Sequence, residues 1–125
     1  MTEFPKPKFR VTSEDVDDRT RVLAASGEVH VSTAPELAEE LDAALKAGRT
    51  RIVLDFSDVE FIDSTGLSVL LNALRRLGRV DGALSLVCTN PTVLRLFEIT
   101  RLDATFDIVA TRDEALRHVA GRVAG

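Results

Sequence analysis

The sequence has 125 residues, a formal net charge of -4, and six Phe but no Trp or Tyr. A chain of this length is expected to fold as one domain and to bury about two-thirds of the surface that it exposes when unfolded. Surfaces that bind nucleic acids or anionic membranes use clustered Lys and Arg, and single-stranded nucleic acids also need aromatic side chains for stacking. This composition argues against both, so a protein is the expected partner.

The N-terminal segment, residues 1–8, carries two prolines and two lysines and nothing to bury, which predicts a flexible lead-in before a domain spanning residues 9–125. The segment lacks the apolar core of a signal peptide, and no apolar run exceeds four residues, which indicates a cytoplasmic protein. Cys88 is the single cysteine, so no disulfide can form within the chain. Its position at a strand end favours a small buried residue.

The first third of the chain predicts two strands and a helix. Residues 9–13 alternate between apolar and polar side chains, as in a strand with one solvated face. The apolar run 22–25 predicts a second strand that pairs with the first as a hairpin. Thr33 and Glu36 have the spacing of a capping box, which predicts the start of an amphipathic helix that Gly48 ends.

The rest of the chain is organised around the stretch 51–77. An apolar run at 52–54 and the apolar pair Phe61 and Ile62 predict a buried strand that leads into a polar turn. After the turn the apolar residues recur with the period of a helix at Leu67, Leu70, Leu71, Leu74 and Leu77. A buried strand therefore leads into a buried helix through a short acidic and hydroxyl-rich connection.

The turn Asp63-Ser64-Thr65-Gly66 has two interpretations. The first N–H groups and the positive dipole end of a helix favour an anion on the first-turn hydroxyls, which would make Ser64 a functional residue. Alternatively, Asp63 or Ser64 is an ordinary N-cap and Gly66 reflects only close backbone packing. The residues alone leave both interpretations open.

Strands and helices continue to alternate to the end of the chain. Residues 84–88 predict a strand, Asn90-Pro91 a capped short helix, and residues 105–109 a last strand. Thr111, with a glutamate three residues later, predicts the start of a final helix. The apolar stripe of that helix is Leu116, Val119, Ala120 and Val123. The order ββαβαβαβα predicts an α/β domain in which amphipathic helices pack against a mixed sheet.

Two strings in the sequence resemble a known family. VLDFSDVEFIDSTGL, at residues 53–67, is similar to the signature of the STAS domain, specifically that of single-domain bacterial anti-sigma factor antagonists. GEVHVSTAPEL, at residues 27–37, resembles the second strand of that family and the start of its first helix. The order of elements also fits from Phe9 to the C-terminus, so the resemblance extends over nearly the whole chain.

The resemblance implies a protein that works by exchanging partners. In that family the serine directly after the aspartate, here Ser64, is phosphorylated by the anti-sigma factor, which is itself an ATP-binding serine kinase. The unphosphorylated form is expected to bind this kinase and release a sigma factor, and phosphorylation stops the binding. A serine phosphatase acting on phospho-Ser64 would restore it.

Phosphorylation would change the charge of the implied contact surface. A phosphate on Ser64 adds about -1.5 to -2 units of charge beside Asp63, and the sequence suggests that Asp55 and Asp58 are also near. Like charges disfavour a dry contact, so the modified surface is expected to release its partner. The residues implied in partner binding are Asp63, Thr65, Gly66, Glu28, His30, Ser32 and Thr33.

Two positions in this region leave questions open. The family commonly has an aspartate after G-E-x, where this chain has His30. The change is either tolerated on the surface, or it alters which kinase is recognised or makes the contact sensitive to pH near neutrality. Thr65 carries a second hydroxyl beside Ser64, and the resemblance favours Ser64 as the modified residue.

Enzyme and metal chemistry have little support in the sequence. Ser64 lacks the G-x-S-x-G context of a serine hydrolase, and the chain has no P-loop motif. The acids between residues 55 and 63 fit a solvated rim better than a metal site. A receiver-like phosphate acceptor at Asp55 would need a late lysine, and no lysine follows Lys46. We expect no catalytic residue, metal or cofactor; the alternative function is a phosphorylation-independent interaction module or a small-ligand-binding domain.

Overall fold

Strands and helices alternate along residues 9–121, the part of the chain that the computed structural model describes. In chain order they are β1 (Arg10–Asp15), β2 (Thr20–Val29), α1 (Ala34–Lys46), β3 (Arg51–Ile62), α2 (Ser64–Gly78), β4 (Ala83–Val87), α3 (Pro91–Ile99), a 3-10 turn η1 (Leu102–Ala104), β5 (Asp107–Val109) and α4 (Arg112–Gly121). The predicted order ββαβαβαβα is confirmed, with η1 added before β5. The expected lead-in, residues 1–8, and Val123 lie outside the described residues.

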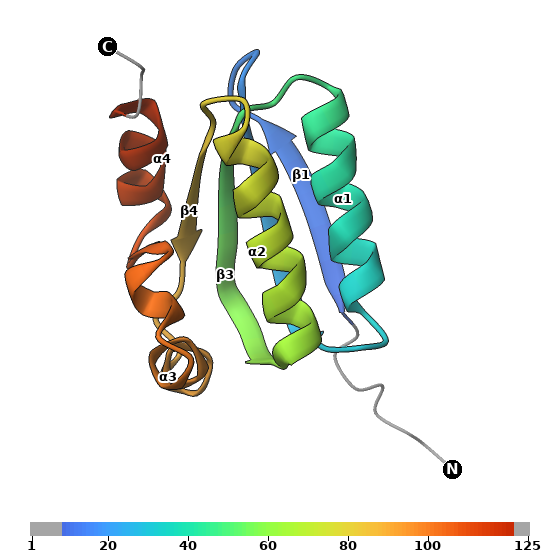
Figure 1. Cartoon of the computed structure of the whole chain (residues 1–125), viewed down its shortest axis with the longest axis vertical. Coiled ribbons are helices and arrows are strands. Elements are labelled where there is room, and N and C mark those ends of the chain that lie inside the picture. Colours follow the sequence, from blue (N-terminus) through green and yellow to red (C-terminus); the bar gives the residue numbers. More distant parts are fainter. Residues whose placement is uncertain (1–8, 122–125) are drawn as a thin grey trace.

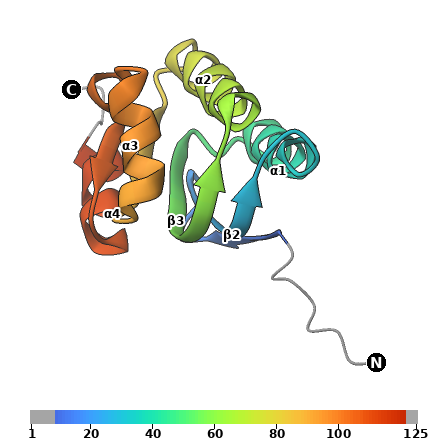
Figure 2. The same cartoon turned by 90° about the horizontal axis from the view of Figure 1, so that it is seen from below.

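The strands form one mixed sheet in which their spatial order, β1-β2-β3-β4-β5, follows the chain. β1 and β2 pair antiparallel, which confirms the predicted hairpin, and the other neighbours pair parallel. Parallel neighbours need a crossover, and helices α1, α2 and α3 lie in the three crossovers. The carboxyl ends of β2 and β3 therefore lie at one end of the molecule with the first turns of α1 and α2 (Figures 1 and 2).

Helices cover both faces of the sheet. α1 and α2 lie side by side on one face, as Figure 2 shows, and their leucines pack on β2 and β3 in the main core. On the other face α4 packs Ala115 and Val119 against Val22 and Val53. The predicted stripe of the last helix was therefore partly wrong, because Ala115 is buried and Ala120 is exposed. Fully burying an aliphatic side chain of leucine or valine size contributes about 1.5 to 3 kcal/mol to stability.

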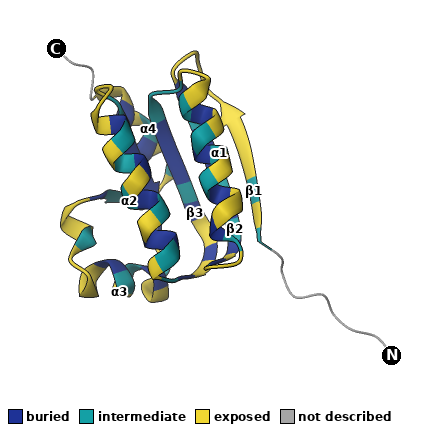
Figure 3. Ribbon diagram, turned by 45° about the vertical axis from the view of Figure 1, so that its right-hand side comes forward, coloured by how far each residue is buried: buried dark blue, intermediate teal, exposed yellow. Residues whose placement is uncertain are grey.

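β3 is the central strand of the sheet. Its residues Ile52, Val53, Leu54 and Phe56 have no exposed surface, as expected for a strand that is covered on both faces. Figure 3 shows β3 buried between the two helices and β1 exposed along the outer edge of the sheet. Cys88 follows β4 and is buried, as predicted, and this burial raises the pKa of its thiol.

β2 continues further than the sequence predicts. Gly27 suggested the end of the strand, but it has a φ of 92° within an irregular part of the pairing with β3, and the strand continues to Val29. A glycine at positive φ inside a strand is typical of a bulge. Glu28 therefore lies in β2, in register with Phe61, and not in the following loop.

Candidate functional site

Asp63 connects the two segments that form this end of the molecule. One carboxylate oxygen, Oδ1, accepts a hydrogen bond from the Gly66 N–H at 3.0 Å and caps α2. The other oxygen, Oδ2, accepts from the Val31 N–H at 3.2 Å in the loop between β2 and α1. The Asp63 N–H donates to the Val29 carbonyl at 3.1 Å. The N-cap that the sequence left open is therefore Asp63, which also holds the neighbouring loop.

Ser64 is the first residue of α2, and its side chain is exposed. Because Asp63 supplies the cap, the Ser64 hydroxyl is not needed for it, and it forms no hydrogen bond with any residue between 9 and 121. The Ser64 carbonyl accepts from the Ser68 hydroxyl at 3.0 Å, one turn along the helix. Thr65, the neighbouring hydroxyl, is half-buried. The more accessible of the two hydroxyls is that of Ser64.

Gly66 lies beneath this surface. A Cβ atom at this position would lie 2.7 Å from Cγ1 of Ile62 and 2.9 Å from Cγ1 of Val29, closer than real Cβ contacts. The structure thus supports the simple interpretation of Gly66, in which the first turn of α2 packs directly on the ends of β2 and β3. Because Gly66 is buried, it shapes the site from below and offers no surface of its own to a partner.

The loop between β2 and α1 is held by its own side chains. The Thr33 hydroxyl donates to the Glu28 carbonyl at 2.6 Å and accepts from the His30 N–H at 2.9 Å. His30 accepts from the Ser32 N–H through Nδ1, and its Nε2 lies 3.6 Å from Oε1 of Glu28. The predicted capping box of α1 was wrong: Thr33 is the N-cap residue, but its side chain caps nothing because the loop uses its hydroxyl.

Two exposed apolar residues that the sequence did not indicate for binding lie on the two segments that meet at Asp63. Val31 is 67% exposed in the loop, and Phe61 is 41% exposed near the end of β3. The prediction of a buried Phe61 was wrong, since the pairing of β2 and β3 is irregular here and Phe61 lies opposite the exposed Glu28. Val31 is an apolar residue between the polar residues His30 and Ser32, and this was a usable signal in the sequence. No periodic pattern could have revealed Phe61.

Acidic side chains lie along the same strands, but they do not act as one group. Glu28, Asp58 and Glu60 are exposed, whereas Asp55 is largely buried. Burial opposes ionisation of Asp55, but hydrogen bonds from Ser57 and Arg112 outweigh it and lower the pKa of this carboxyl group. Among residues 9–121, no group of three His, Cys, Asp or Glu side chains is arranged to hold a metal ion.

Asp55 is also too far from Ser64 to act on it directly, contrary to the expectation from the sequence. Asp55 and Ile62 are seven positions apart along β3, which is roughly 20 Å. In addition, the Arg112 guanidinium donates to Oδ2 of Asp55 at 3.0 Å. The acid directly beside Ser64 is Asp63.

Comparison with known proteins identifies a matching family. A family model described as the STAS domain matches residues 12–115. A protein of Thermotoga neapolitana, named as a candidate anti-sigma factor antagonist, is 43% identical over 81 residues, which make up 65% of this chain and 72% of the relative.

Solved structures agree over most of the chain. The crystal structure of an anti-sigma factor antagonist from Mycobacterium paratuberculosis has a TM-score of 0.83 and 33% identity, covering 94% of this chain and 99% of that one. SpoIIAA in its unphosphorylated form has a TM-score of 0.78 and 29% identity, covering 91% and 99%. The phosphorylated form of SpoIIAA, from Bacillus, has a TM-score of 0.70 and 27% identity, covering 88% and 99%.

Proposed function

This chain belongs to the STAS domain family, and on that basis we propose that it is an anti-sigma factor antagonist that phosphorylation of Ser64 switches off. In its unphosphorylated form it binds an anti-sigma factor, an ATP-binding serine kinase, and so releases the sigma factor. The kinase then phosphorylates Ser64 and the complex dissociates. A serine phosphatase acting on phospho-Ser64 returns the chain to its binding form.

One observation carries this proposal. The Ser64 hydroxyl is exposed at the start of α2, and the capping bond of that helix comes from Asp63. A serine that caps its own helix would have to give up that bond when modified, whereas this hydroxyl is available to a kinase. Its position also suits a phosphate in the free protein, because the first N–H groups of a helix favour an anion.

The phosphate would act on the partner through charge. It adds about -1.5 to -2 units beside the Asp63 carboxylate, which already accepts two hydrogen bonds in this structure. A partner surface that covers Ser64 would have to bury this charge beside a second anion. A loss of roughly 3 kcal/mol on burying an unpaired charge corresponds to about a hundredfold lower affinity. That difference is large enough for the chain to change partners.

The surface around Ser64 indicates the chemistry of its partner. Val31, whose N–H bonds to Asp63, and Phe61, three residues before Ser64, offer exposed apolar area, and Glu28 and Glu60 add exposed acids next to Phe61. We infer that the partner presents an apolar contact bordered by Lys or Arg. Thr33 and Ser32 contribute mainly by fixing the loop that carries Val31, through their bonds within that loop.

The remaining parts of the proposal concern the whole chain. Residues 9–125 act as one STAS domain that serves as a substrate and a ligand rather than as a catalyst, and neither nucleic acid nor membrane takes part. None of the helices within residues 9–121 is long and apolar enough to cross a membrane. A regulator of sigma factors works in the cytoplasm, so the proposal places the chain there.

The experiment that tests this function uses four purified baits: wild type, Ser64→Ala, Ser64→Asp and Ser68→Asp. Ser68 is exposed one turn further along α2, so Ser68→Asp adds the same charge to the same helix. Each bait first captures proteins from an ATP-depleted lysate of the source organism, and a separate incubation with ATP tests phosphorylation. Mass spectrometry identifies the captured proteins in the first and the phosphorylated residues in the second.

Wild type, Ser64→Ala and Ser68→Asp should capture an ATP-binding serine kinase that Ser64→Asp loses, with phosphate on Ser64 of the wild type. Equal capture by all four baits would refute the switch and favour a phosphorylation-independent interaction module. Phosphate on Thr65 alone would refute the assignment of the modified residue.

A further inference from the structure

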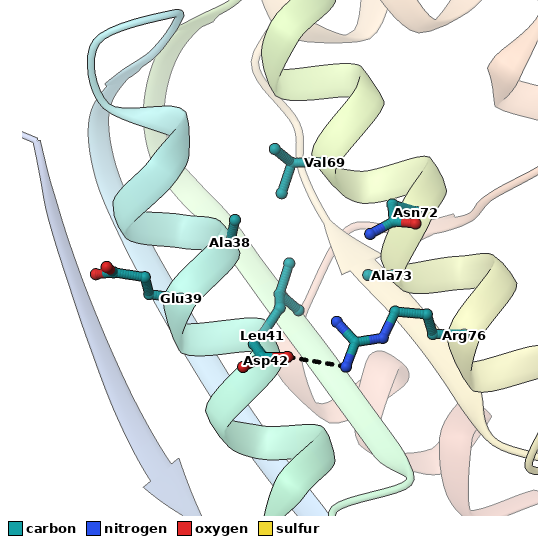
Figure 4. A pocket seen from close by; sticks show the side chains of 8 residues that line it. All are labelled: Ala38, Glu39, Leu41, Asp42, Val69, Asn72, Ala73 and Arg76. Carbon is teal, nitrogen blue, oxygen red and sulfur yellow. Dashed lines mark hydrogen bonds and ion pairs between the residues drawn. The ribbon is translucent and has the colours of Figure 1, made fainter.

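A groove of about 330 Å³ lies between α1 and α2. Figure 4 shows its lining from both helices, with Ala38 and Leu41 on α1 facing Val69 and Ala73 on α2. The lining starts more than one helical turn into each helix, at Ala38 in α1 and at Val69 in α2. The groove is therefore separate from the turn that carries Ser64. Its size lies at the lower end of the range for small-molecule sites.

The floor of the groove is apolar. Leu41 and Ala73 are both 3% exposed, and Val69 is half-buried beside them. Ala38 and Ala73 have no side-chain atoms beyond Cβ, so the helices leave open space where larger residues would fill it. A ligand with an apolar body would therefore remove this floor from water, which favours binding.

One end of the groove carries hydrogen-bond donors. The Arg76 guanidinium reaches across from α2, and its Nη2 donates to Oδ1 of Asp42 at 2.9 Å (Figure 4). Among residues 9–121, this is the only acceptor of the Arg76 side chain, so its other N–H groups remain available. The Asn72 amide lies on the same side of the groove and adds further donors.

The charges around these donors leave room for an anion. Asp42 also pairs with Lys46 at 2.9 Å, so two cations already share this one carboxylate. Glu39 also borders the groove, but it is exposed, and Figure 4 shows its side chain pointing away from Arg76. An arginine with spare donors can bind a second carboxylate, because its five N–H groups form a planar fork.

We propose that the groove between α1 and α2 binds a small carboxylate with a short apolar chain. The carboxylate accepts hydrogen bonds from Arg76 and Asn72, and the chain lies over Leu41 between Ala38 and Val69. Ala38 and Asp42 are four residues apart, about 6 Å along the helix, which suits a chain of five or six carbons. This site is independent of the role proposed for Ser64.

The test uses hexanoate as the probe and hexan-1-ol as its uncharged counterpart. Both are titrated into the ¹⁵N-labelled full chain at neutral pH, and amide shifts are followed by NMR. Hexanoate should shift the amides of residues 38–42 and 69–76 saturably, with a Kd on the order of 1 mM, as expected for so small a ligand. Hexan-1-ol should bind about tenfold more weakly, since it lacks the charge-assisted hydrogen bond.

Two pairs of variants separate the parts of the site. Ala38→Leu fills the groove and should abolish hexanoate binding, whereas Ala43→Leu, at an exposed position of the same helix, should not alter it. Arg76→Gln should weaken hexanoate binding about tenfold while leaving that of hexan-1-ol unchanged. Arg75→Gln, at the exposed neighbouring position, should leave both unchanged, and Arg76→Lys should recover part of the loss. The amide spectra also report whether each variant is folded.

Three results would overturn the proposal. The first is the absence of saturable shifts up to several times the expected Kd. The second is equal binding of hexanoate and hexan-1-ol, which would show an apolar groove without carboxylate recognition. The third is hexanoate binding that survives both Ala38→Leu and Arg76→Gln in folded protein, which would place the probe elsewhere as an adventitious additive only.

Discussion

The two oxygens of the Asp63 carboxylate bind different segments of the chain. Oδ1 fixes the first turn of α2, and Oδ2 fixes the loop that carries Val31. Both segments belong to the proposed partner surface, so a single residue sets their relative position. Neither its spacing from Gly66 nor its acidity could show this in the sequence, since the bond to Val31 spans 32 residues.

Replacing Asp63 with asparagine should separate these two roles. Asn is also a good N-cap, so the bond to Gly66 is retained, but an amide NH2 cannot accept the Val31 N–H in the place of Oδ2. We expect the Val31 amide to exchange with solvent about tenfold faster, because losing one hydrogen bond to a charged group costs about 1.5 kcal/mol or more. Native-state hydrogen exchange by NMR measures this. Asp81→Asn, in an exposed turn, is the control. An unchanged exchange rate at the Val31 amide would show that its hydrogen bond to Asp63 does not stabilise the loop.

Gly66→Ala should destabilise the protein. The added Cβ would lie 2.7 Å from Ile62 and 2.9 Å from Val29, so the start of α2 must move away from the strands. Overpacking of this kind costs about 1 to 3 kcal/mol. Urea denaturation measures the loss, with Gly78→Ala as the matched variant, since a Cβ at Gly78 meets nothing within 4 Å. Equal stability of the two variants would contradict the close packing at Gly66.

Phe61→Ala should weaken binding to the proposed kinase about tenfold, with little change in stability. Phe61 is 41% exposed and offers apolar area that a partner would bury. Calorimetric titration with the captured partner measures the affinity. Ile99→Ala is the control, since Ile99 is 67% exposed at the end of α3. If both variants bind like the wild type, Phe61 lies outside the contact.

At the level of elements, one side-chain contact attaches α4 to the centre of the sheet. Arg112, the first residue of α4, donates to Asp55 on β3 through Nε at 3.2 Å and Nη2 at 3.0 Å. The same guanidinium lies 3.6 Å from Glu14 on β1. The contact therefore joins three elements that are distant in the sequence, on the face of the sheet opposite α1 and α2.

This contact makes stability depend on pH. The pKa of Asp55 is lowered in the folded protein, so the carboxylate contributes stability above its unfolded pKa, and this contribution is lost as the pH falls through the folded pKa. Asp55→Asn should therefore cost about 1 to 2 kcal/mol at pH 7, and the difference from wild type should begin to shrink below about pH 4 and vanish only once the pH is below the lowered pKa of the folded protein. Urea denaturation at several pH values measures it, with the exposed Asp58→Asn as control. A loss that persists at low pH would mean that the carboxylate's charge is not its cause.

The element boundaries show where reasoning from sequence works and where it stops. Thr33 and Thr111 have the same capping-box spacing, but only the Thr111 hydroxyl caps its helix, accepting from the Glu114 N–H at 3.2 Å. Thr33 instead bonds to the Glu28 carbonyl near the end of β2 and to the His30 N–H in its own loop. The spacing describes which cap bond is possible locally, and at Thr33 the competing hydrogen bonds to Glu28 and His30 take its place. The order of elements was predictable, because hydrophobic periods persist over whole strands and helices.

For the whole molecule, the proposed switch should leave the fold intact. Ser64 is exposed, and an anion at a helix N-terminus is stabilising by about 0.3 to 1 kcal/mol, which repulsion from Asp63 offsets. The free energy of unfolding of Ser64→Asp should therefore lie within about 1 kcal/mol of the wild-type value, and its amide spectrum should be native. Thermal denaturation measures this, with Ser68→Asp as the charge-matched control. A large loss of stability would show that weaker partner binding reflects unfolding rather than altered surface charge.

The candidate site was predictable only in part. The change from strand to helix period marked the turn, and the resemblance to the STAS family singled out Ser64 within it. The sequence could not show that Asp63, and not Ser64, caps α2, that Gly66 is buried, or that Val31 and Phe61 are exposed. Each of these depends on how β2 and β3 end beside each other, which is a tertiary feature.

The agreement between strand order and chain order also bears on synthesis. Each parallel strand joins the sheet beside the strand that precedes it, so the fold can grow as the polypeptide leaves the ribosome. The segment up to Gly78 already contains every residue assigned to the Ser64 surface. Until Ala83–Val87 emerges, however, the buried strand Arg51–Ile62 has an open edge that can pair with another nascent chain. A pause in translation after Gly78 has left the ribosome, but before Ala83–Val87 has, would therefore expose the newborn protein to aggregation at its central strand.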